Sequence, residues 1–193
     1  MGKANARTVR GSASDLILKT AAQLFTEKGV HGTSLNDIAD AACMSKGTLY
    51  YHYPAKEQLV LDIADAYINR TTDTVFVWMG EVNREVSLRD AVLSLLEALA
   101  QEDGDDAQPN LHMVLCAEAA TGNEPLVQKL QEAYRAWTVM LEVGLLRANI
   151  HNADTVLRNS RVFFTLLDGY RLQNNGALTG AELSFIADYL SEE

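Results

Sequence analysis

The sequence predicts an all-α fold, and three observations support that prediction. Only three prolines and twelve glycines interrupt 193 residues, which favours long helices over many short strands. Apolar residues recur at helical spacing along most of the chain, and several of these stretches begin at a residue that can cap a helix. No two neighbouring stretches alternate apolar and polar residues as a pair of β-strands would.

The composition is that of an ordinary globular protein. Hydrophobic residues make up 48% of the chain and charged residues 22%, which excludes a disordered chain, and no apolar run approaches the length that spans a bilayer. The basic start of the chain lacks the apolar centre of a secretory signal. The two cysteines, Cys43 and Cys116, provide no disulfide framework, so we expect a protein of the reducing cytoplasm that binds no membrane.

Three short helices are expected after an acid-free basic segment at residues 1–14, which we interpret as a flexible arm. Each helix is preceded by a serine that can cap its first turn: Ser14, Ser34 and Ser45. Gly29 ends the first helix, and Asp37 completes a capping box with Ser34. Three helices within about forty residues predict a helix-turn-helix head.

The third of these helices has the composition of a DNA-reading element, because it combines hydrogen-bond donors and aromatic hydroxyls with one apolar anchor, Leu49. Residues 1–56 contain seven Lys or Arg and four Asp or Glu, whereas the rest of the chain contains nine and twenty-two. A mildly basic head on an acidic body would turn only its head toward phosphate. DNA binding at the N-terminal end is therefore compatible with the overall net charge of −10.

Beyond Lys56 the apolar periodicity predicts six further helices, at about residues 56–82, 87–99, 111–120, 123–145, 153–173 and 179–190. Ser87, Asn123 and Thr179 are placed to cap three of them, the last in a capping box with Glu182. The acidic segment at residues 102–110 is expected to be a loop. It lacks the glycine and the distal glutamate of a calcium-binding EF-hand.

The sequence contains no signature of an enzyme or a cofactor site. There is no nucleophile elbow, phosphate-binding loop, dinucleotide fingerprint or zinc motif. His112 and Cys116 lie four residues apart, a spacing that can hold two metal ligands, but no second ligand pair accompanies them. We therefore predict a non-enzymatic protein with no cofactor and no metal.

Two stretches, ILKTAAQLFTEKG at residues 17–29 and TSLNDIADAACMSKGTLYYHYPAKEQLV at residues 33–60, closely resemble the N-terminal domain of TetR-family transcriptional regulators. The resemblance covers about the first quarter to third of the chain, and its caps, apolar anchors and GTLYYHY helix occur in register. It implies about nine helices, a homodimer formed through the last two, a double-stranded DNA operator and a small-molecule pocket in each body.

The resemblance also implies a division of the chain and a set of DNA contacts. The expected regions are the arm at residues 1–14, a DNA-binding domain at 15–55, and an effector-binding and dimerisation domain at 56–193. The positions that match the DNA contacts of the family are Ser34, Ser45, Lys46, Gly47, Thr48, Tyr50, Tyr51, His52 and Lys56. Lys56, at the start of the long helix, is expected to bind the DNA backbone.

The body offers candidates for an effector pocket and for a dimer interface. Its aromatic, sulfur-containing and histidine side chains are candidate pocket residues: Trp78, His112, Met113, Cys116, Tyr134, Trp137 and Met140. Apolar residues of the last two helices are candidate interface residues: Phe163, Phe164, Leu167, Leu183, Ile186 and Leu190. The sequence alone leaves open which of them belong to the core.

The head departs from the family pattern at one place, the Cys43–Met44 turn, where a glycine and a small aliphatic residue are usual. A left-handed conformation at Cys43 would cost about 1 kcal/mol relative to glycine. We interpret Cys43 as a small, semi-buried residue rather than a redox switch. The favoured function is a dimeric repressor that a small molecule releases from a palindromic operator. Two alternatives stay open: an activator or co-repressor-dependent regulator, and a ligand-binding protein that has lost DNA binding.

Overall fold

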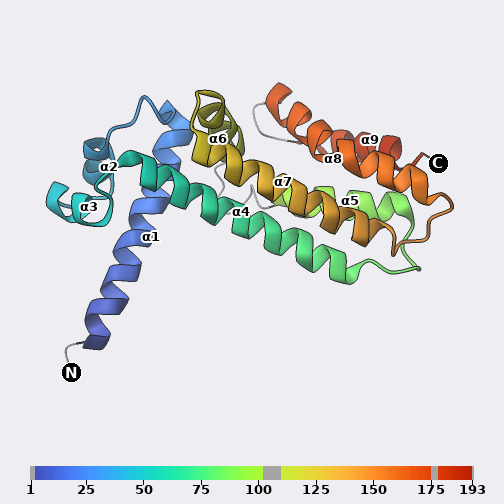
Figure 1. Cartoon of the computed structure of the whole chain (residues 1–193), viewed down its shortest axis with the longest axis horizontal. Coiled ribbons are helices and arrows are strands. Elements are labelled where there is room, and N and C mark those ends of the chain that lie inside the picture. Colours follow the sequence, from blue (N-terminus) through green and yellow to red (C-terminus); the bar gives the residue numbers. More distant parts are fainter. Residues whose placement is uncertain (1–2, 102–109, 175–177, 193) are drawn as a thin grey trace.

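The protein is an elongated helical molecule with a small head at one end (Figure 1). The computed structural model describes residues 3–101, 110–174 and 178–192, with the backbone alone for residues 3–12. Those residues form nine α-helices and no β-strand, which confirms the predicted all-α fold. The helices are α1 (Lys3–Lys28), α2 (Leu35–Ala41), α3 (Lys46–His52), α4 (Lys56–Glu81), α5 (Leu88–Gln101), α6 (Leu111–Ala120), α7 (Glu124–Leu145), α8 (Ala153–Gln173) and α9 (Gly180–Ser191).

Local capping fixes where most of these helices begin and end. Ser34 and Asp37 form the predicted capping box of α2, and Thr179 and Glu182 form that of α9. Gly29 ends α1 with a φ of 75°, a left-handed conformation that glycine adopts without steric cost. The predicted starts of α2 and α9 and the predicted end of α1 are therefore confirmed.

Helix α1 begins earlier than the sequence predicts. It starts at Lys3, so most of the predicted flexible arm at residues 1–14 is helical and Ser14 lies inside the helix. The Ser14 hydroxyl lies 3.2 Å from the Tyr53 hydroxyl instead of capping a first turn. The segment before Ser14 contains no proline, and its three alanines, Ala4, Ala6 and Ala13, favour a helix.

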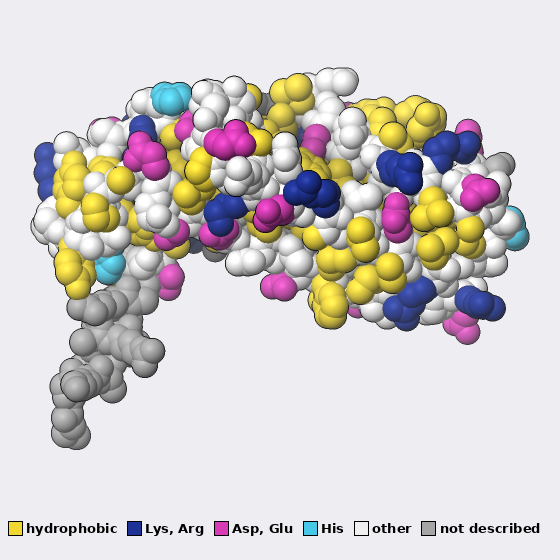
Figure 2. Space-filling model, viewed as in Figure 1, with side chains coloured by type: hydrophobic (Ala, Val, Ile, Leu, Met, Phe, Trp, Pro, Cys, Tyr) yellow, Lys and Arg dark blue, Asp and Glu magenta, His cyan; other side chains and the backbone are white. Residues whose placement is uncertain are grey.

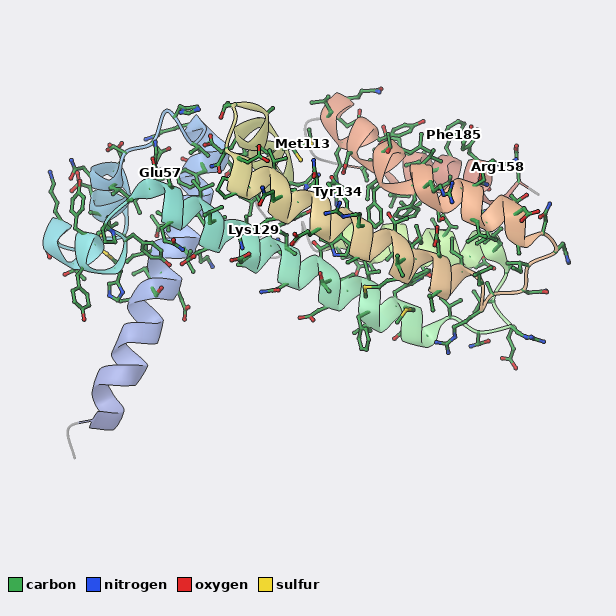
Figure 3. The ribbon with its side chains drawn as sticks, viewed as in Figure 1. Glu57, Met113, Lys129, Tyr134, Arg158 and Phe185 are labelled. Carbon is green, nitrogen blue, oxygen red and sulfur yellow. The ribbon has the colours of Figure 1, made fainter. Side chains whose placement is uncertain are left out.

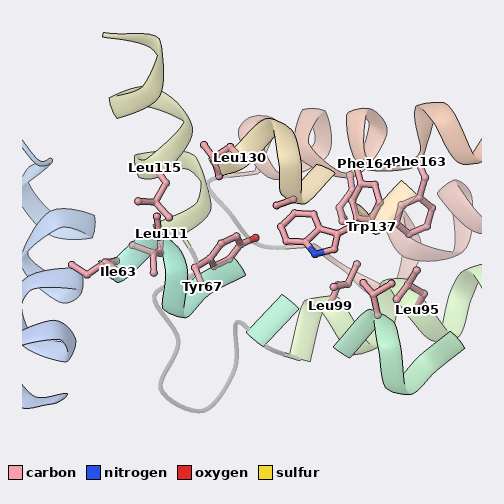
Figure 4. Close-up of a cluster of buried hydrophobic side chains, with 14 of the residues drawn as sticks. Ile63, Tyr67, Leu95, Leu99, Leu111, Leu115, Leu130, Trp137, Phe163 and Phe164 are labelled. Atoms are coloured by element: carbon pink, nitrogen blue, oxygen red, sulfur yellow. The ribbon is translucent and has the colours of Figure 1, made fainter. Parts of the chain in front are cut away.

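The body is a bundle in which the long helix α4 packs against α7, α5 against α9, and α8 against both α7 and α9. Helix α6 bridges the two parts, because it contacts α1 of the head as well as α4, α7 and α8. Figure 4 shows buried side chains continuing from Ile63 and Tyr67 near the head to Trp137 and Phe163 in the body. One apolar core therefore joins head and body.

Two predicted breaks between helices fall partly outside the described residues. Of the acidic loop at residues 102–110, only Asn110 is described, immediately before α6, and residues 175–177 of the break before α9 are also outside. Among the helices that are described, none has the length and hydropathy that crossing a membrane requires.

Candidate nucleic-acid interface and buried polar cluster

Helix α3 presents a polar face to solvent and is held by one apolar side chain. Leu49 is completely buried against the head, where Ile38 of α2 is equally buried. The other predicted contact residues of this helix and its cap are exposed: Ser45, Lys46, Gly47, Thr48, Tyr50 and Tyr51. His52 is half-buried, with its ring edge-on to Tyr51 at 5.4 Å between centroids. The burial pattern separates an anchoring side from an outward, donor-rich side.

Side-chain caps fix the starts of the two head helices. The Ser45 hydroxyl accepts a hydrogen bond from the Thr48 amide at 3.0 Å and lies 2.8 Å from the Thr48 hydroxyl. Ser34 is exposed, and its side chain and amide both donate to the Asp37 carboxylate, which lowers the pKa of that carboxyl group. These contacts fix the residues at which α2 and α3 begin.

The turn between α2 and α3 has the geometry of a Schellman motif. The Met44 amide donates to the Ala39 carbonyl at 3.0 Å, and the Cys43 amide donates to the Asp40 carbonyl at 3.1 Å. Cys43 has a φ of 53°, so it adopts the left-handed conformation that glycine usually supplies. Its side chain is exposed, which corrects the expectation of a semi-buried residue.

Lys56 makes contacts within the head. Its ammonium group donates to the carbonyl oxygens of Val30, at 2.7 Å, and Thr33, at 3.0 Å. These bonds tie the start of α4 to the loop that follows α1. Two of its three donor hydrogens therefore position the head, and the third stays available for the predicted contact with a DNA phosphate.

A buried polar cluster joins three helices of the body. His112 of α6 is 4% exposed, and its Nε2 atom lies 2.9 Å from the Tyr134 hydroxyl of α7 and 3.1 Å from a carboxylate oxygen of Asp168 of α8. The Tyr134 hydroxyl donates to the other Asp168 oxygen. The Cys116 sulfur lies 3.5 Å from the same imidazole nitrogen. The second ring nitrogen of His112, Nδ1, has no hydrogen-bond partner among the described residues.

The electrostatics of this cluster favour a charged His112. Burial alone lowers the pKa of the imidazole, but its hydrogen bond to Asp168 and its contact with Cys116 outweigh that effect and raise the pKa to about 9. Burial and the Asp168 carboxylate raise the pKa of the Tyr134 phenol, so this hydroxyl stays protonated and acts as a donor. The cluster is therefore a buried imidazolium–carboxylate pair with a phenol attached.

Aromatic rings surround the cluster. The Tyr67 ring lies 5.3 Å from the His112 ring, and the Tyr134 ring contacts Trp137 at 5.4 Å and Phe164 at 5.9 Å. Figure 3 shows Tyr134 extending from the middle of the bundle. A polar centre within aromatic walls is the usual chemistry of a small-molecule site.

The structure brings together only some of the predicted pocket residues. His112, Cys116, Tyr134 and Trp137 meet at the cluster, whereas Met113 and Met140 are simply half-buried. Trp78 lies elsewhere, because its indole nitrogen donates to the Ala91 carbonyl and the Ser94 hydroxyl of α5. No group of three or more His, Cys, Asp or Glu side chains in the described part of the chain is arranged to hold a metal ion.

Asp168 is the member of the cluster that sequence reasoning missed. It lies one helical turn after Phe164, which is buried, and three residues before Arg171, which is also buried. A charged side chain on the apolar stripe of a helix was the signal that could have identified it. The partner in α6, 56 positions earlier, gives no local signal at all.

The predicted dimer residues of the last two helices belong to the core of a single chain. Their exposures lie between 1% and 7% for Phe163, Phe164, Leu167, Leu183, Ile186 and Leu190. The exposed apolar side chains of the same helices are Val162, Leu172, Phe185 and Tyr189. Figure 2 shows apolar side chains gathered over α8 and α9, and Phe185 projects outward in Figure 3. The six candidate interface residues therefore face the inside of the chain, and the exposed apolar residues of the same helices are the ones that a partner could contact.

Comparison with known proteins agrees with this geometry. Residues 17–63 match the family described as bacterial regulatory proteins, tetR family. The HTH-type transcriptional regulator LmrA of Bacillus subtilis is 30% identical over 155 residues, which cover 76% of this chain and 81% of LmrA. The HTH-type transcriptional repressor KstR2 of Mycolicibacterium smegmatis is 36% identical over 58 residues, 30% of this chain and 28% of that protein.

Solved structures share the fold over nearly the whole length. A crystal structure of a TetR-family regulator from Mesorhizobium loti superposes with a TM-score of 0.73 at 20% identity and covers 94% of both chains. At that identity the likeness describes the fold alone. Together, the family match at residues 17–63 and the structural likeness place the head and the body in one known architecture.

Proposed function

The chain belongs to the TetR family of bacterial transcriptional regulators, and we propose that it is a dimeric repressor that a small molecule releases from a palindromic DNA operator. The observation that carries this proposal is the outward polar face of α3, anchored by the buried Leu49 and capped by Ser45. In this proposal residues 15–55 bind DNA, and residues 56–193 bind the effector and the second subunit.

The recognition surface divides into base-reading and backbone-binding groups. Lys46 and Thr48 lie in the first turn of α3, where they can reach base edges in the major groove. Tyr50, Tyr51 and His52 follow and supply polar tips to flanking phosphates. Ser34, Ser45 and Gly47 complete the surface. The space beside Gly47 is open, since an added Cβ would meet only the Ser45 hydroxyl, at 3.8 Å, so DNA could come close to the backbone there.

The exposed apolar side chains of α8 and α9 are our proposed dimer interface. Val162, Phe185 and Tyr189 are 41%, 58% and 55% exposed, and covering them would remove a large apolar area from water. The Tyr170 ring packs beside Phe185 at 6.3 Å between centroids, so this surface is continuous across both helices. Two subunits joined here would present two heads to two half-sites.

The polar cluster is our proposed effector site. The unpaired His112 Nδ1 can donate to an oxygen or nitrogen acceptor of the effector, and the surrounding rings can hold an apolar or aromatic frame. One of the three helices that meet at the cluster, α6, also contacts α1 of the head. Helix α6 carries His112, and its Glu118 lies 3.5 Å from His31 of the head.

Release from DNA follows from this connection. A ligand that displaces α6 or α4 moves the parts of the head that those helices hold, including the loop that Lys56 ties down. Because each head is fixed to its own α4, a small tilt changes the distance between the two recognition helices. Linkage then requires that operator DNA weaken effector binding by the same factor.

The DNA-binding half of the proposal is tested by fluorescence anisotropy with duplexes from the region upstream of the gene that encodes the chain. We expect sequence-selective, salt-sensitive binding that Lys46→Ala weakens by about 1–3 kcal/mol. Arg84→Ala is the matched control, because Arg84 is an exposed cation beyond the far end of α4. If no duplex is bound selectively, or if both variants behave alike, the proposal is wrong.

The repressor half of the proposal is tested by whether the effector lowers or raises the affinity of the protein for its operator. A compound that stabilises the wild-type protein against heat should lower its operator affinity. A compound that raises this affinity would instead identify a co-repressor-dependent regulator.

A further inference from the structure

A pocket lies between the head and the body, next to the Tyr67 side of the polar cluster. It has a volume of about 180 Å³ and is formed by α1, α4 and α6. Its floor is apolar and buried, with Ala22, Ile63, Tyr67 and Leu111. None of His112, Cys116, Tyr134 or Asp168 lines it, so the polar groups of the proposed effector site lie outside this pocket, and the two sites share only the Tyr67 ring.

The rim of this junction pocket is cationic. Lys19 of α1 and Arg70 of α4 line it, and both side chains are exposed. The Arg70 guanidinium carbon lies 5.9 Å from the centre of the Tyr67 ring, a cation–π contact that holds the charge over the pocket wall. No acidic side chain is among the described residues that line the pocket, although the chain as a whole carries a net charge of −10.

We propose that the junction pocket binds a small amphipathic anion, namely a carboxylate on a short aliphatic chain. The two cations pair with the carboxylate. The apolar floor buries the aliphatic chain of the ligand, and the transfer of that chain out of water lowers the free energy. The volume sets the size of the ligand. A protein cavity of about 150 Å³ accommodates benzene, so this pocket suits a chain of about five or six carbons.

Occupancy of the pocket has a consequence for the geometry of the protein. The ligand would contact α1 of the head and α4 and α6 of the body at once, and so stabilise their present arrangement. Tyr67 forms part of the pocket floor and also lies 5.3 Å from His112, which gives the junction pocket a direct contact with the cluster. The site is therefore placed to modulate how the body controls the head.

Hexanoate is the probe, with hexanol and hexylamine as matched neutral and cationic controls of the same chain length. Binding is measured by saturation-transfer NMR and by the rise in melting temperature, without operator DNA, so the result does not depend on the proposed repressor function. We expect saturable millimolar binding of hexanoate, with hexanol at least about fivefold weaker and hexylamine not bound.

Two kinds of variant locate the site. Lys19→Gln combined with Arg70→Gln should weaken hexanoate binding at least about fivefold, and Ala66→Phe should abolish it by filling the rim. Arg84→Gln, which removes a remote exposed cation, should leave binding unchanged. The absence of saturable binding overturns the proposal. Equal binding by the wild-type protein and the charge-removal variant does so as well, even if the Ala66 variant fails to fold.

Discussion

Raising the pH should destabilise the protein through a single side chain, His112. The imidazole titrates at about pH 9 in the folded chain and at 6.5 in an unfolded one, so between these values the folded state binds the extra proton. Stability that depends on a raised pKa is fully present below pH 6.5 and is lost as the pH rises through 9. The free energy of unfolding should therefore fall across this window.

The size of the effect follows from the shift. Moving a pKa from 6.5 to about 9 adds roughly 3 kcal/mol to the free energy of unfolding of the protonated form. Because His112 is 4% exposed, solvent screening reduces this value little. The steepest loss should approach about 1.4 kcal/mol per pH unit. The total of roughly 3 kcal/mol is a large fraction of the free energy of unfolding of a typical domain.

The assay is urea unfolding at fixed protein concentration from about pH 6 to about pH 10, together with NMR titration of the imidazole. His112→Gln should remove most of the slope above pH 6.5. Asp168→Asn should bring the pKa of His112 well below 9, because a neutral amide stabilises the imidazolium less than a carboxylate does, whereas burial still lowers the pKa. An imidazole that titrates near 6.5 in the wild-type protein would refute the reasoning.

Three further predictions concern the head and the dimer. Tyr51→Ala should weaken operator binding by about 1–3 kcal/mol in anisotropy measurements while leaving the melting temperature unchanged, since this side chain is 65% exposed; normal binding would mean that α3 does not read the operator. Cys43→Gly should raise the free energy of unfolding by about 1 kcal/mol in urea titrations, because it relieves a left-handed conformation, and a loss of stability would contradict this. Phe185→Glu should give folded monomers by light scattering, whereas Phe164→Glu should unfold the chain, because Phe164 is 7% exposed; a dimeric Phe185 variant would place the interface elsewhere.

The sequence determined the elements whose signals are local. The capping boxes of Ser34 with Asp37 and of Thr179 with Glu182 join residues three positions apart, and both occur as predicted. The order of the helices and the outward polar face of α3 follow from the same short-range rules. Residues within one helical turn contact one another directly, so a sequence pattern on that scale predicts these features.

The tertiary structure decided what each side chain meets. Phe164 and Phe185 are both aromatic residues on the last two helices, yet one is buried and the other exposed, because packing against the neighbouring helices selects the face. The His112–Asp168 pair and the Lys56 bonds to Val30 and Thr33 join positions far apart in the chain. Such partners depend on how the helices pack, and no local pattern specifies them. The sequence thus determined the helix-turn-helix head, and the packing of the body determined which of its side chains are buried together and which are exposed.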